Sequence, residues 1–240
     1  MVDPGSRVFK TYNYRKDKMK QNRTRIIKMN NARHMVITPK ARLSFPNLFK
    51  PREKMDGNGL EYSCDLIWET KDELKVAYKG KKIQTVSLMQ ASINAKKDQW
   101  GPDKDAWPDM KYTPFKDGNE SINKETGKVR DGYKDGWFIQ AKSAEKFPPK
   151  ILSKAGKPLT ENDVYGGCFV QAQLMARPYS FGGNHGIRFL LLCLMKLEDG
   201  ERFGGGGNNA MFDVTEEDDS DMEINESEDG SDDEEDGDDF

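Results

Sequence analysis

Apolar and polar residues alternate along several short segments, a pattern that predicts β-strands with one buried face. In the first segment, after Met35, the predicted inward residues are Ala41, Leu43 and Phe45, and the outward residues are Lys40, Arg42 and Ser44. Pro46, Pro51 and residues 56–59 then mark a loop and turn. Alternation resumes at Leu60, Tyr62, Cys64, Leu66 and Trp68. Two neighbouring antiparallel strands are therefore expected.

A helical segment is expected next in the chain. Thr70 and Glu73 have the spacing of a capping box, in which their side chains satisfy backbone amides at a helix start. We expect helix over 70–97, broken at Gly80, with a buried stripe formed by Leu74, Ala77, Tyr78, Ile83, Val86, Met89 and Ile93. Residues 98–135 are rich in Gly, Pro, Asp, Asn and Lys, and they predict a long loop region with room for a short hairpin.

Three further strands complete the pattern. Residues 137–141 and 168–177 alternate, the latter with Val170, Ala172, Leu174 and Ala176 on one face. Residues 187–197 are nearly all apolar, which predicts a strand buried on both faces. A Gly-rich turn over 180–186 joins the last two strands as a hairpin. Five strands, one inserted helical segment and long loops predict a mainly β fold, an OB-fold-like five-stranded barrel.

Charge divides the chain into a basic body and an acidic tail. The formal net charge is −3, but residues 213–240 hold 17 Asp and Glu and no Lys or Arg. Residues 1–212 therefore carry 38 basic and 41 − 17 = 24 acidic residues, a net charge of +14. A basic body attracts polyanions, of which nucleic acid is the commonest for such a protein. An anionic membrane surface is the alternative.

Composition also predicts the domain organisation. Ten Lys or Arg and little apolar patterning in residues 1–33 predict a flexible basic arm over 1–34. The folded domain with the OB-fold-like barrel is expected over 35–203, and a Gly/Asn hinge over 204–212. Self-repulsion among its carboxylates predicts that the acidic tail, 213–240, is disordered.

Other classes of protein fit the sequence poorly. No run of 18 apolar residues and no apolar signal core occur, so an intracellular protein without a membrane span is expected. The three cysteines, Cys64, Cys168 and Cys193, lie far apart in apolar runs and predict reduced core residues. Without a CxxC pair, no metal site is expected, and no cofactor motif is present.

Cations beside aromatic rings supply candidate DNA contacts. A single-strand binder needs cations for phosphates and rings for stacked bases, each stacked base contributing about 1–3 kcal/mol. The candidates are Lys40, Arg42, Phe49, Lys50, Arg52, Lys111, Tyr112, Phe115, Lys116, Tyr133, Lys134, Trp137, Lys142, Arg177, Tyr179, Phe181 and Arg188. Any domain also needs rings for its core, and Trp68, Phe138, Phe169 and Phe189 are assigned there.

An enzyme is not expected. No Walker loop occurs. Asp65 with Glu73 and Lys75 imitates the carboxylate and lysine spacing of some nucleases, but the triplet falls in the predicted helix. A DNA-processing nuclease is therefore the third hypothesis. The second is a scaffold or chaperone that binds basic proteins through the acidic tail.

The end of the chain carries a further signal. Asp236, Asp238 and Asp239 precede Phe240, which places one large apolar ring at the end of a polyanion. Such a ring suits a basic pocket lined by aromatic residues in a partner protein.

These features together resemble a known family, the bacteriophage single-stranded DNA-binding proteins, including the type found in podophages. The resemblance covers residues 35–240. It is based on Asp238-Asp239-Phe240, the acidic run from Glu216, the apolar passage 187–197 that leads through Phe203 into glycines, and the stretch 41–49.

The resemblance implies an OB-fold body that coats unpaired DNA during phage replication and recombination, in the cytoplasm of the infected bacterium. It also implies a tail that recruits polymerase and helicase-primase and shields the DNA groove when DNA is absent. The charges permit this competition, because 17 acids can lie against a body of net charge +14. A homodimer is compatible with the sequence, which does not determine the oligomeric state.

Overall fold

The computed structural model describes residues 33–54, 56–110 and 112–204. Its strands are β1 (Met35–Ile37), β2 (Ala41–Glu53), β3 (Leu60–Trp68), β4 (Lys116–Asp117), β5 (Trp137–Ala144), β6 (Lys150–Ser153), β7 (Phe169–Phe181) and β8 (Asn184–Glu198). Its helices are α2 (Leu88–Trp100) and the 3₁₀ turns η1 (Lys71–Lys75), η2 (Gly118–Glu120) and η3 (Glu161–Asp163).

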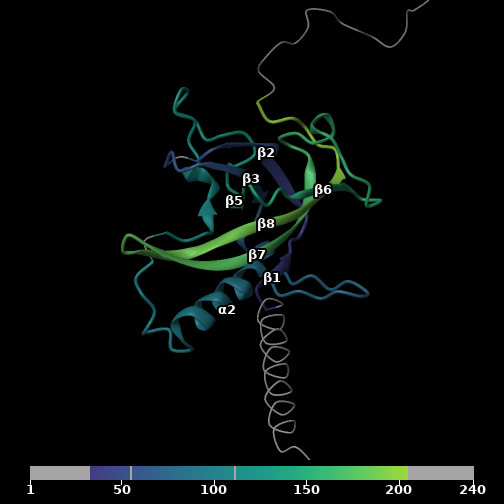
Figure 1. Cartoon of the computed structure of the whole chain (residues 1–240). Helices are drawn as coiled ribbons and strands as arrows, with labels where there is room; N and C mark the ends of the chain where they lie inside the picture. The colour runs from purple at the N-terminus through teal and green to yellow at the C-terminus, as the bar shows by residue number, and fades with distance from the viewer. Residues whose placement is uncertain (1–32, 55, 111, 205–240) are drawn as a thin grey trace, which may run out of the picture. The chain divides into compact units, whose positions relative to one another are not determined.

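Five of the described strands close into a barrel. The pairs β2–β3, β3–β5, β7–β8 and β2–β7 are antiparallel, and β5–β8 is parallel, so the order β2-β3-β5-β8-β7 returns to β2. β1 adds to β7, and β6 adds to β8. The predicted OB-like barrel, with its five strands and terminal hairpin, is therefore confirmed (Figure 1).

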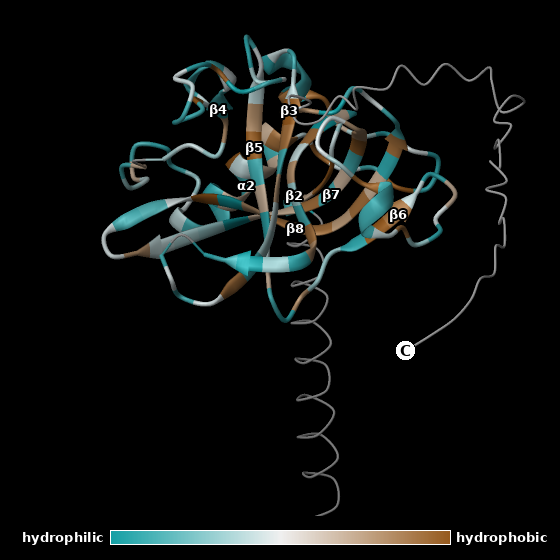
Figure 2. Ribbon diagram, turned by 90° about the horizontal axis from the view of Figure 1, so that it is seen from above, coloured by the Kyte–Doolittle hydropathy of each residue, from teal (hydrophilic) through white to brown (hydrophobic). Residues whose placement is uncertain are grey.

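Alternating apolar residues fill the barrel. Leu43, Leu66, Ile139, Leu174 and Phe189, one from each barrel strand, are at most 1% exposed. In Figure 2 the hydrophobic residues follow these strands, while the loops are mainly hydrophilic. Burial of such side chains contributes about 1.5–3 kcal/mol each, which makes the barrel interior the main source of stability.

The inward pattern predicted for β2 is wrong at Phe45. Ala41 and Leu43 are buried as expected, but Ser44 is buried and Phe45 is 45% exposed. The register of β2 with β3 shifts between Ser44 and Asn47, and Phe45 has a φ of 45°. An irregularity of this kind turns the following side chain to the other face.

The loop predicted at Pro46 and Pro51 is part of β2 instead. In the described residues, the register of β2 with β7 covers only Ala41 and Arg42. Leu43 still makes backbone hydrogen bonds to Gly167 and Cys168, just before β7. Beyond Leu43 the β7 side of the strand is an edge among the described residues, where a residue without an N–H group removes no ladder hydrogen bond.

The predicted helix over 70–97 is shorter than expected. Thr70 does start a capped turn, since its backbone N–H donates to Glu73 Oε2 at 3.0 Å, but this turn is η1 and ends at Lys75. Helix α2 begins after Ser87, whose Oγ accepts from the Gln90 N–H. Ile83, predicted in the buried stripe, is 57% exposed. The buried face of α2 consists of Leu88, Ala91, Ser92, Asn94 and Ala95.

β8 is not buried on both faces throughout. Ile187, Phe189, Leu191 and Leu194 are buried, whereas the intervening apolar residues are half-buried. The prediction from the apolar run was too high because β8 lies in the barrel wall, where only one face of a strand points into the core.

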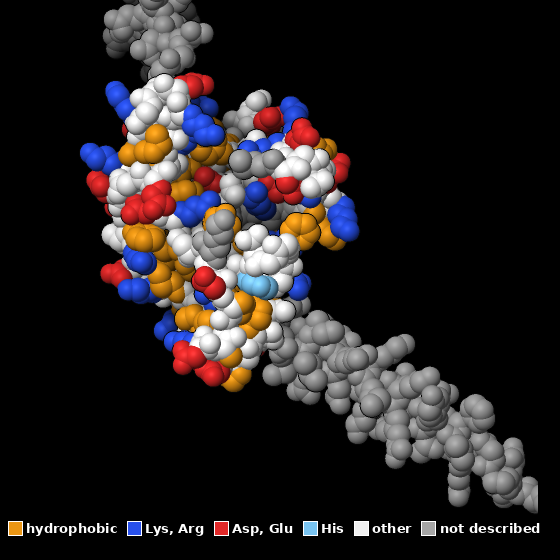
Figure 3. All heavy atoms as spheres, turned by 90° about the vertical axis from the view of Figure 1, so that its left-hand side faces the viewer, with side chains coloured by type: hydrophobic (Ala, Val, Ile, Leu, Met, Phe, Trp, Pro, Cys, Tyr) orange, Lys and Arg blue, Asp and Glu red, His pale blue; other side chains and the backbone are white. Residues whose placement is uncertain are grey.

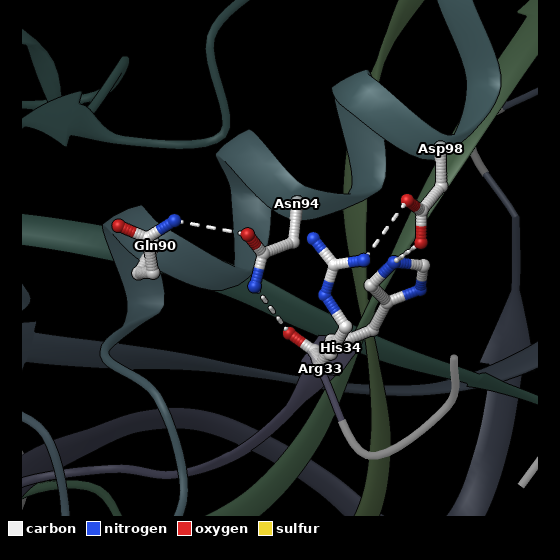
Figure 4. Close-up of polar contacts among 5 residues, drawn as sticks. All are labelled: Arg33, His34, Gln90, Asn94 and Asp98. Carbon is white, nitrogen blue, oxygen red and sulfur yellow. Dashed lines mark hydrogen bonds and ion pairs between the residues drawn. The ribbon is translucent and has the colours of Figure 1, made fainter. Parts of the chain in front are cut away.

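The start of the described chain is held against α2. His34 Nε2 lies 2.9 Å from Asp98 Oδ2, and Arg33 Nη1 lies 3.6 Å from Asp98 Oδ1 (Figure 4). Asn94 Nδ2 donates to the Arg33 carbonyl at 2.9 Å and its Oδ1 accepts from Gln90. Residues 33 and 34, which composition places in the arm, therefore contact the folded body.

The predicted arm before Arg33, and the hinge and tail after Gly204, lie outside the described residues. Within the part that the structure describes, no helix is long and apolar enough to cross a membrane.

Candidate nucleic-acid interface

The outer face of β3 and β5 is the first candidate for a ligand surface. In OB-folds, the corresponding second and third barrel strands and two adjoining loops bind oligonucleotides. The paired residues Ser63 and Lys142, Asp65 and Gln140, and Ile67 and Phe138 lie directly opposite one another. Opposed residues of an antiparallel pair point to the same face. Their neighbours along each strand, such as Leu66 and Ile139, fill the barrel, so these six face outward.

Three cavities lined by described residues adjoin across this face and its edges. The first, about 520 Å³, and the second, about 670 Å³, share Phe45 and Arg130. The second and the third, about 410 Å³, share Lys116 and Glu120. We call this row of cavities the candidate groove. Figure 3 shows a hollowed face of the molecule with Lys and Arg side chains in and around the hollow.

Phe45 stands in the wall between the first two cavities. Its ring is 45% exposed, and the Arg130 guanidinium carbon lies 5.1 Å from its centroid. The ring of Tyr133 supports it from 6.4 Å. A non-glycine residue with φ of 45° is uncommon, and such backbone strain concentrates at functional sites. The bulge therefore holds an aromatic ring out toward solvent in the groove.

Two further cation and ring pairs follow along the groove. Lys116 Nζ lies 5.5 Å from the ring centroid of Phe138, and both residues line the second cavity. Lys71 Nζ lies 4.1 Å from the ring centroid of Trp137, and both line the third cavity. Such pairs combine a charge for phosphate with a flat surface for a base.

Tyr133, predicted to stack on a base, is instead a core residue. Its side chain is 1% exposed and packs with Ile67 and Phe138. Its hydroxyl donates to Asp65 Oδ2 at 2.8 Å. The ring lies beneath the groove and presents no exposed face to a base. Phe45, which the strand pattern had placed in the core, is the residue that presents an exposed aromatic face in the groove.

Asp65 is a carboxylate in the floor of the second cavity and is 7% exposed. Burial raises the pKa of its carboxyl, while the Tyr133 hydrogen bond and the charges of Lys116 and Arg52 lower it in part. Burial and the neighbouring carboxylate likewise raise the pKa of the Tyr133 hydroxyl, which keeps it a donor.

Tyr133→Phe is expected to lower the free energy of unfolding by about 2 kcal/mol, because it removes a hydrogen bond to a buried carboxylate. In the wild type this bond stabilises the ionised form of Asp65. The loss of unfolding free energy in the variant should therefore be largest at neutral pH and should shrink as the pH falls through the raised pKa of Asp65. Thermal unfolding of both proteins at several pH values measures this. Tyr62→Phe, at a half-buried tyrosine of β3, is the control; equal deficits for the two variants would contradict the assignment.

The predicted residues of β7 and β8 gather on their hairpin. Arg177 and Arg188 are exposed and lie opposite each other. Tyr179 follows toward the turn, and Phe181 at the tip is 85% exposed. This hairpin is the loop that joins the last two barrel strands, one of the two loops that flank an OB-fold ligand face.

Other predicted cations engage acceptors within the body. Lys40 lies 3.3 Å from Glu198, Lys50 2.9 Å from Glu161 and Lys142 2.7 Å from Glu61. Arg42 Nη2 donates to the Glu201 carbonyl at 2.8 Å. DNA must compete with these partners. Lys71, Lys116 and Arg130 of the groove form no ion pair with another described residue, so they are stronger candidates.

The remaining predicted residues lie partly in the candidate groove and partly outside it. Arg52 and Lys116 line the second cavity, while Phe115, Lys116 and Trp137 line the third. Phe49 and Phe115 pack against the core, and Tyr112 and Lys134 are exposed. Lys111 and the tail residues Asp236, Asp238, Asp239 and Phe240 lie outside the described residues.

The last described residues reach the first cavity. Phe203 lies on Gly132, where an added Cβ would come within 2.2 Å of its ring, and the Phe203 N–H donates to the Gly166 carbonyl at 3.0 Å. Arg42 covers the ring from 4.5 Å. Phe203 and Gly204 both line the first cavity, so the chain leaves the barrel at the edge of the groove.

Sequence reasoning missed Phe45, Lys71, Lys124 and Arg130 in the groove. Arg130 has no ring beside it in sequence, and its partner Phe45 lies on another strand. One usable signal was the step Phe45-Pro46, where a proline interrupts the alternation.

The carboxylates of the nuclease hypothesis are engaged separately. Asp65 accepts from Tyr133, and Glu73 caps Thr70. Among the described residues, no group of three or more His, Cys, Asp or Glu could hold a metal ion.

Comparison with known proteins assigns the family. The model of the Enterobacter phage Enc34 ssDNA-binding protein matches residues 34–224. The single-stranded DNA-binding protein from bacteriophage Enc34, solved in complex with ssDNA, is 24% identical with a TM-score of 0.54 over 71% of this chain and 90% of that one. A C-terminal truncation of that protein is 23% identical, with a TM-score of 0.51 over 71% and 89%. No curated protein matches the chain. These structures share the fold, and the match to the family model shows that this chain belongs to the Enc34 family of bacteriophage single-stranded DNA-binding proteins.

Proposed function

We propose that the protein binds unpaired DNA along the candidate groove without a sequence requirement, and coats it during phage replication and recombination in the cytoplasm of the infected bacterium. The observation that carries this proposal is the row of cavities on the outer face of β3 and β5, where Arg130 lies beside Phe45, Lys116 beside Phe138 and Lys71 beside Trp137. Cations next to rings suit a strand whose phosphates and bases alternate. The protein acts by binding and is not an enzyme.

The β7–β8 hairpin extends this surface. Phe181 and Tyr179 offer rings, and Arg177 and Arg188 offer charge, on a loop that flanks the ligand face in OB-folds. DNA that leaves the groove would meet these side chains next.

The acidic tail has two roles in this proposal. Its 17 carboxylates compete with DNA for the cations of the body. When DNA displaces it, the tail becomes available to polymerase and helicase-primase, with Asp236, Asp238, Asp239 and Phe240 as the recognised end.

Fluorescence anisotropy with labelled oligo-dT and a duplex of equal length tests the function. We expect affinity for the single strand to be at least about tenfold higher, because the bases of a duplex are stacked on each other and cannot stack on Phe45. The logarithm of the association constant should fall linearly with the logarithm of the salt concentration, because binding releases the counterions that are condensed on the DNA.

Two outcomes would contradict the proposal. Equal affinity for the single strand and the duplex would exclude a single-strand-specific groove. Capture of basic proteins through the tail with no shift of DNA would favour the scaffold or chaperone hypothesis instead.

A further inference from the structure

The second cavity contains polar atoms that neither phosphate binding nor base stacking requires. Ser63 and Arg52 line it. Ser63 Oγ and Arg52 Nε are buried and, among the described residues, have no hydrogen-bond partner. Ser63 is only 2% exposed. Buried polar groups are normally paired, and an unpaired one in a native structure calls for a ligand or another explanation.

A hydrogen-bond acceptor lies beside these two donors. Asp65 lines the same cavity and is adjacent to Ser63 on the outer face of β3. Its carboxylate accepts a hydrogen bond from the Tyr133 hydroxyl at Oδ2, and a carboxylate has about four lone-pair sites, so it can accept further bonds. Gln140 lies opposite it and interacts with it.

A carboxylate is unfavourable in a groove for a polyanion. Negative charge repels phosphates, and burial disfavours the ionised form of Asp65 itself. The bond to Tyr133 explains part of its presence, but a serine or asparagine could also accept that bond without the charge. Its position in the cavity is explained if it pairs with an amino group of the ligand.

A ring is in place to hold a base flat in this cavity. Phe45 lines the second cavity with an exposed ring, and Phe138 lines it from the strand beside Asp65. A base stacked on Phe45 would present its edge to the polar floor of the cavity.

We propose that the second cavity reads the Watson–Crick edge of one nucleobase and prefers cytosine. Cytosine has an amino group that donates to Asp65, beside two acceptors that can receive bonds from Ser63 Oγ and Arg52 Nε. Thymine has the O4 carbonyl in place of the amino group, so O4 and the Asp65 carboxylate would be two acceptors facing each other with no donor between them. This inference rests on the proposed function and adds one selective subsite to a groove that otherwise tolerates any sequence.

Anisotropy titrations with oligo-dC and oligo-dT of equal length test the preference. We expect about fivefold or greater preference for oligo-dC at neutral pH, the lower end of the discrimination typical of a good base contact. Asp65→Asn should abolish the preference, because an amide can also donate to O4. Ser63→Ala should reduce it, and this small change at a buried site is less able to disturb the fold.

Glu125→Gln is the matched control. Glu125 is an exposed carboxylate on the loop that carries Arg130 and is not a lining residue of the three cavities. Its neutralisation should leave the ratio of the two affinities at the wild-type value. Thermal unfolding of each variant establishes that it is folded before its ratio is compared.

The outcomes separate this inference from the proposed function. Wild-type protein that binds oligo-dC and oligo-dT equally well retains the proposed function and overturns the cytosine subsite. Folded Asp65→Asn and Ser63→Ala proteins that keep the wild-type ratio overturn it as well. Failure to bind either oligonucleotide would overturn the proposed function itself.

Discussion

Phe45→Ala is expected to weaken binding of oligo-dT by about tenfold or more, because one stacked base contributes about 1–3 kcal/mol. The ring is 45% exposed, stands between two cavities and is held outward by the bulge of β2. Stability should change little, because nearly half of the side-chain surface is already exposed to solvent. Anisotropy titration of the variant and the wild type measures the loss.

Phe147→Ala is the matched control. Phe147 is 64% exposed and has a cation beside it, since Lys146 Nζ lies 5.3 Å from its ring centroid. It is not among the lining residues of the three cavities, so its removal should leave affinity within about twofold of wild type. Equal losses for both variants would show that any exposed ring contributes, and would remove the groove from the explanation.

Deletion of residues 213–240 should tighten binding of single-stranded DNA by about tenfold at low salt, with a smaller gain as salt rises. The deletion removes 17 carboxylates from a body of net charge +14. A tethered polyanion has a high local concentration at the cations with which DNA must pair. Titrations of full-length and shortened protein over a salt series measure the difference.

A tail of unchanged length with its acids replaced by Asn and Gln distinguishes charge from chain length. This variant should behave like the deletion. Phe240→Ala should leave DNA affinity unchanged, because one ring contributes no charge, yet reduce capture of polymerase or helicase-primase. If the shortened protein binds DNA no better than full-length protein at low salt, the tail does not compete with DNA.

The barrel was accessible from the sequence because the evidence for it is local. Alternation in β3, β5 and β7 depends only on neighbouring residues, and it correctly placed Leu66, Ile139 and Leu174 in the core. The capping box at Thr70 was also real. It did not determine the length of the helix, because helices in proteins are stabilised mainly by packing, and residues after η1 such as Val76 and Ile83 are exposed.

The candidate groove was accessible only in part. Arg52, Lys116 and Trp137 were found because a cation and a ring stand near each other in sequence. Arg130 was not predicted, because the ring beside it is that of Phe45, which lies far from it in sequence.

The sequence alone determined the five strands, the division into basic body and acidic tail, and the resemblance to phage single-stranded DNA-binding proteins, since periodicity, charge and motif order are properties of the chain itself. Only the tertiary structure decided which rings are exposed in the candidate groove. Tyr133 is buried against Ile67 and Phe138, with its hydroxyl paired to Asp65. Phe45 is exposed because an irregularity in β2 turns its side chain to the other face of the strand. Exposure depends on contacts between distant segments, which no local pattern contains.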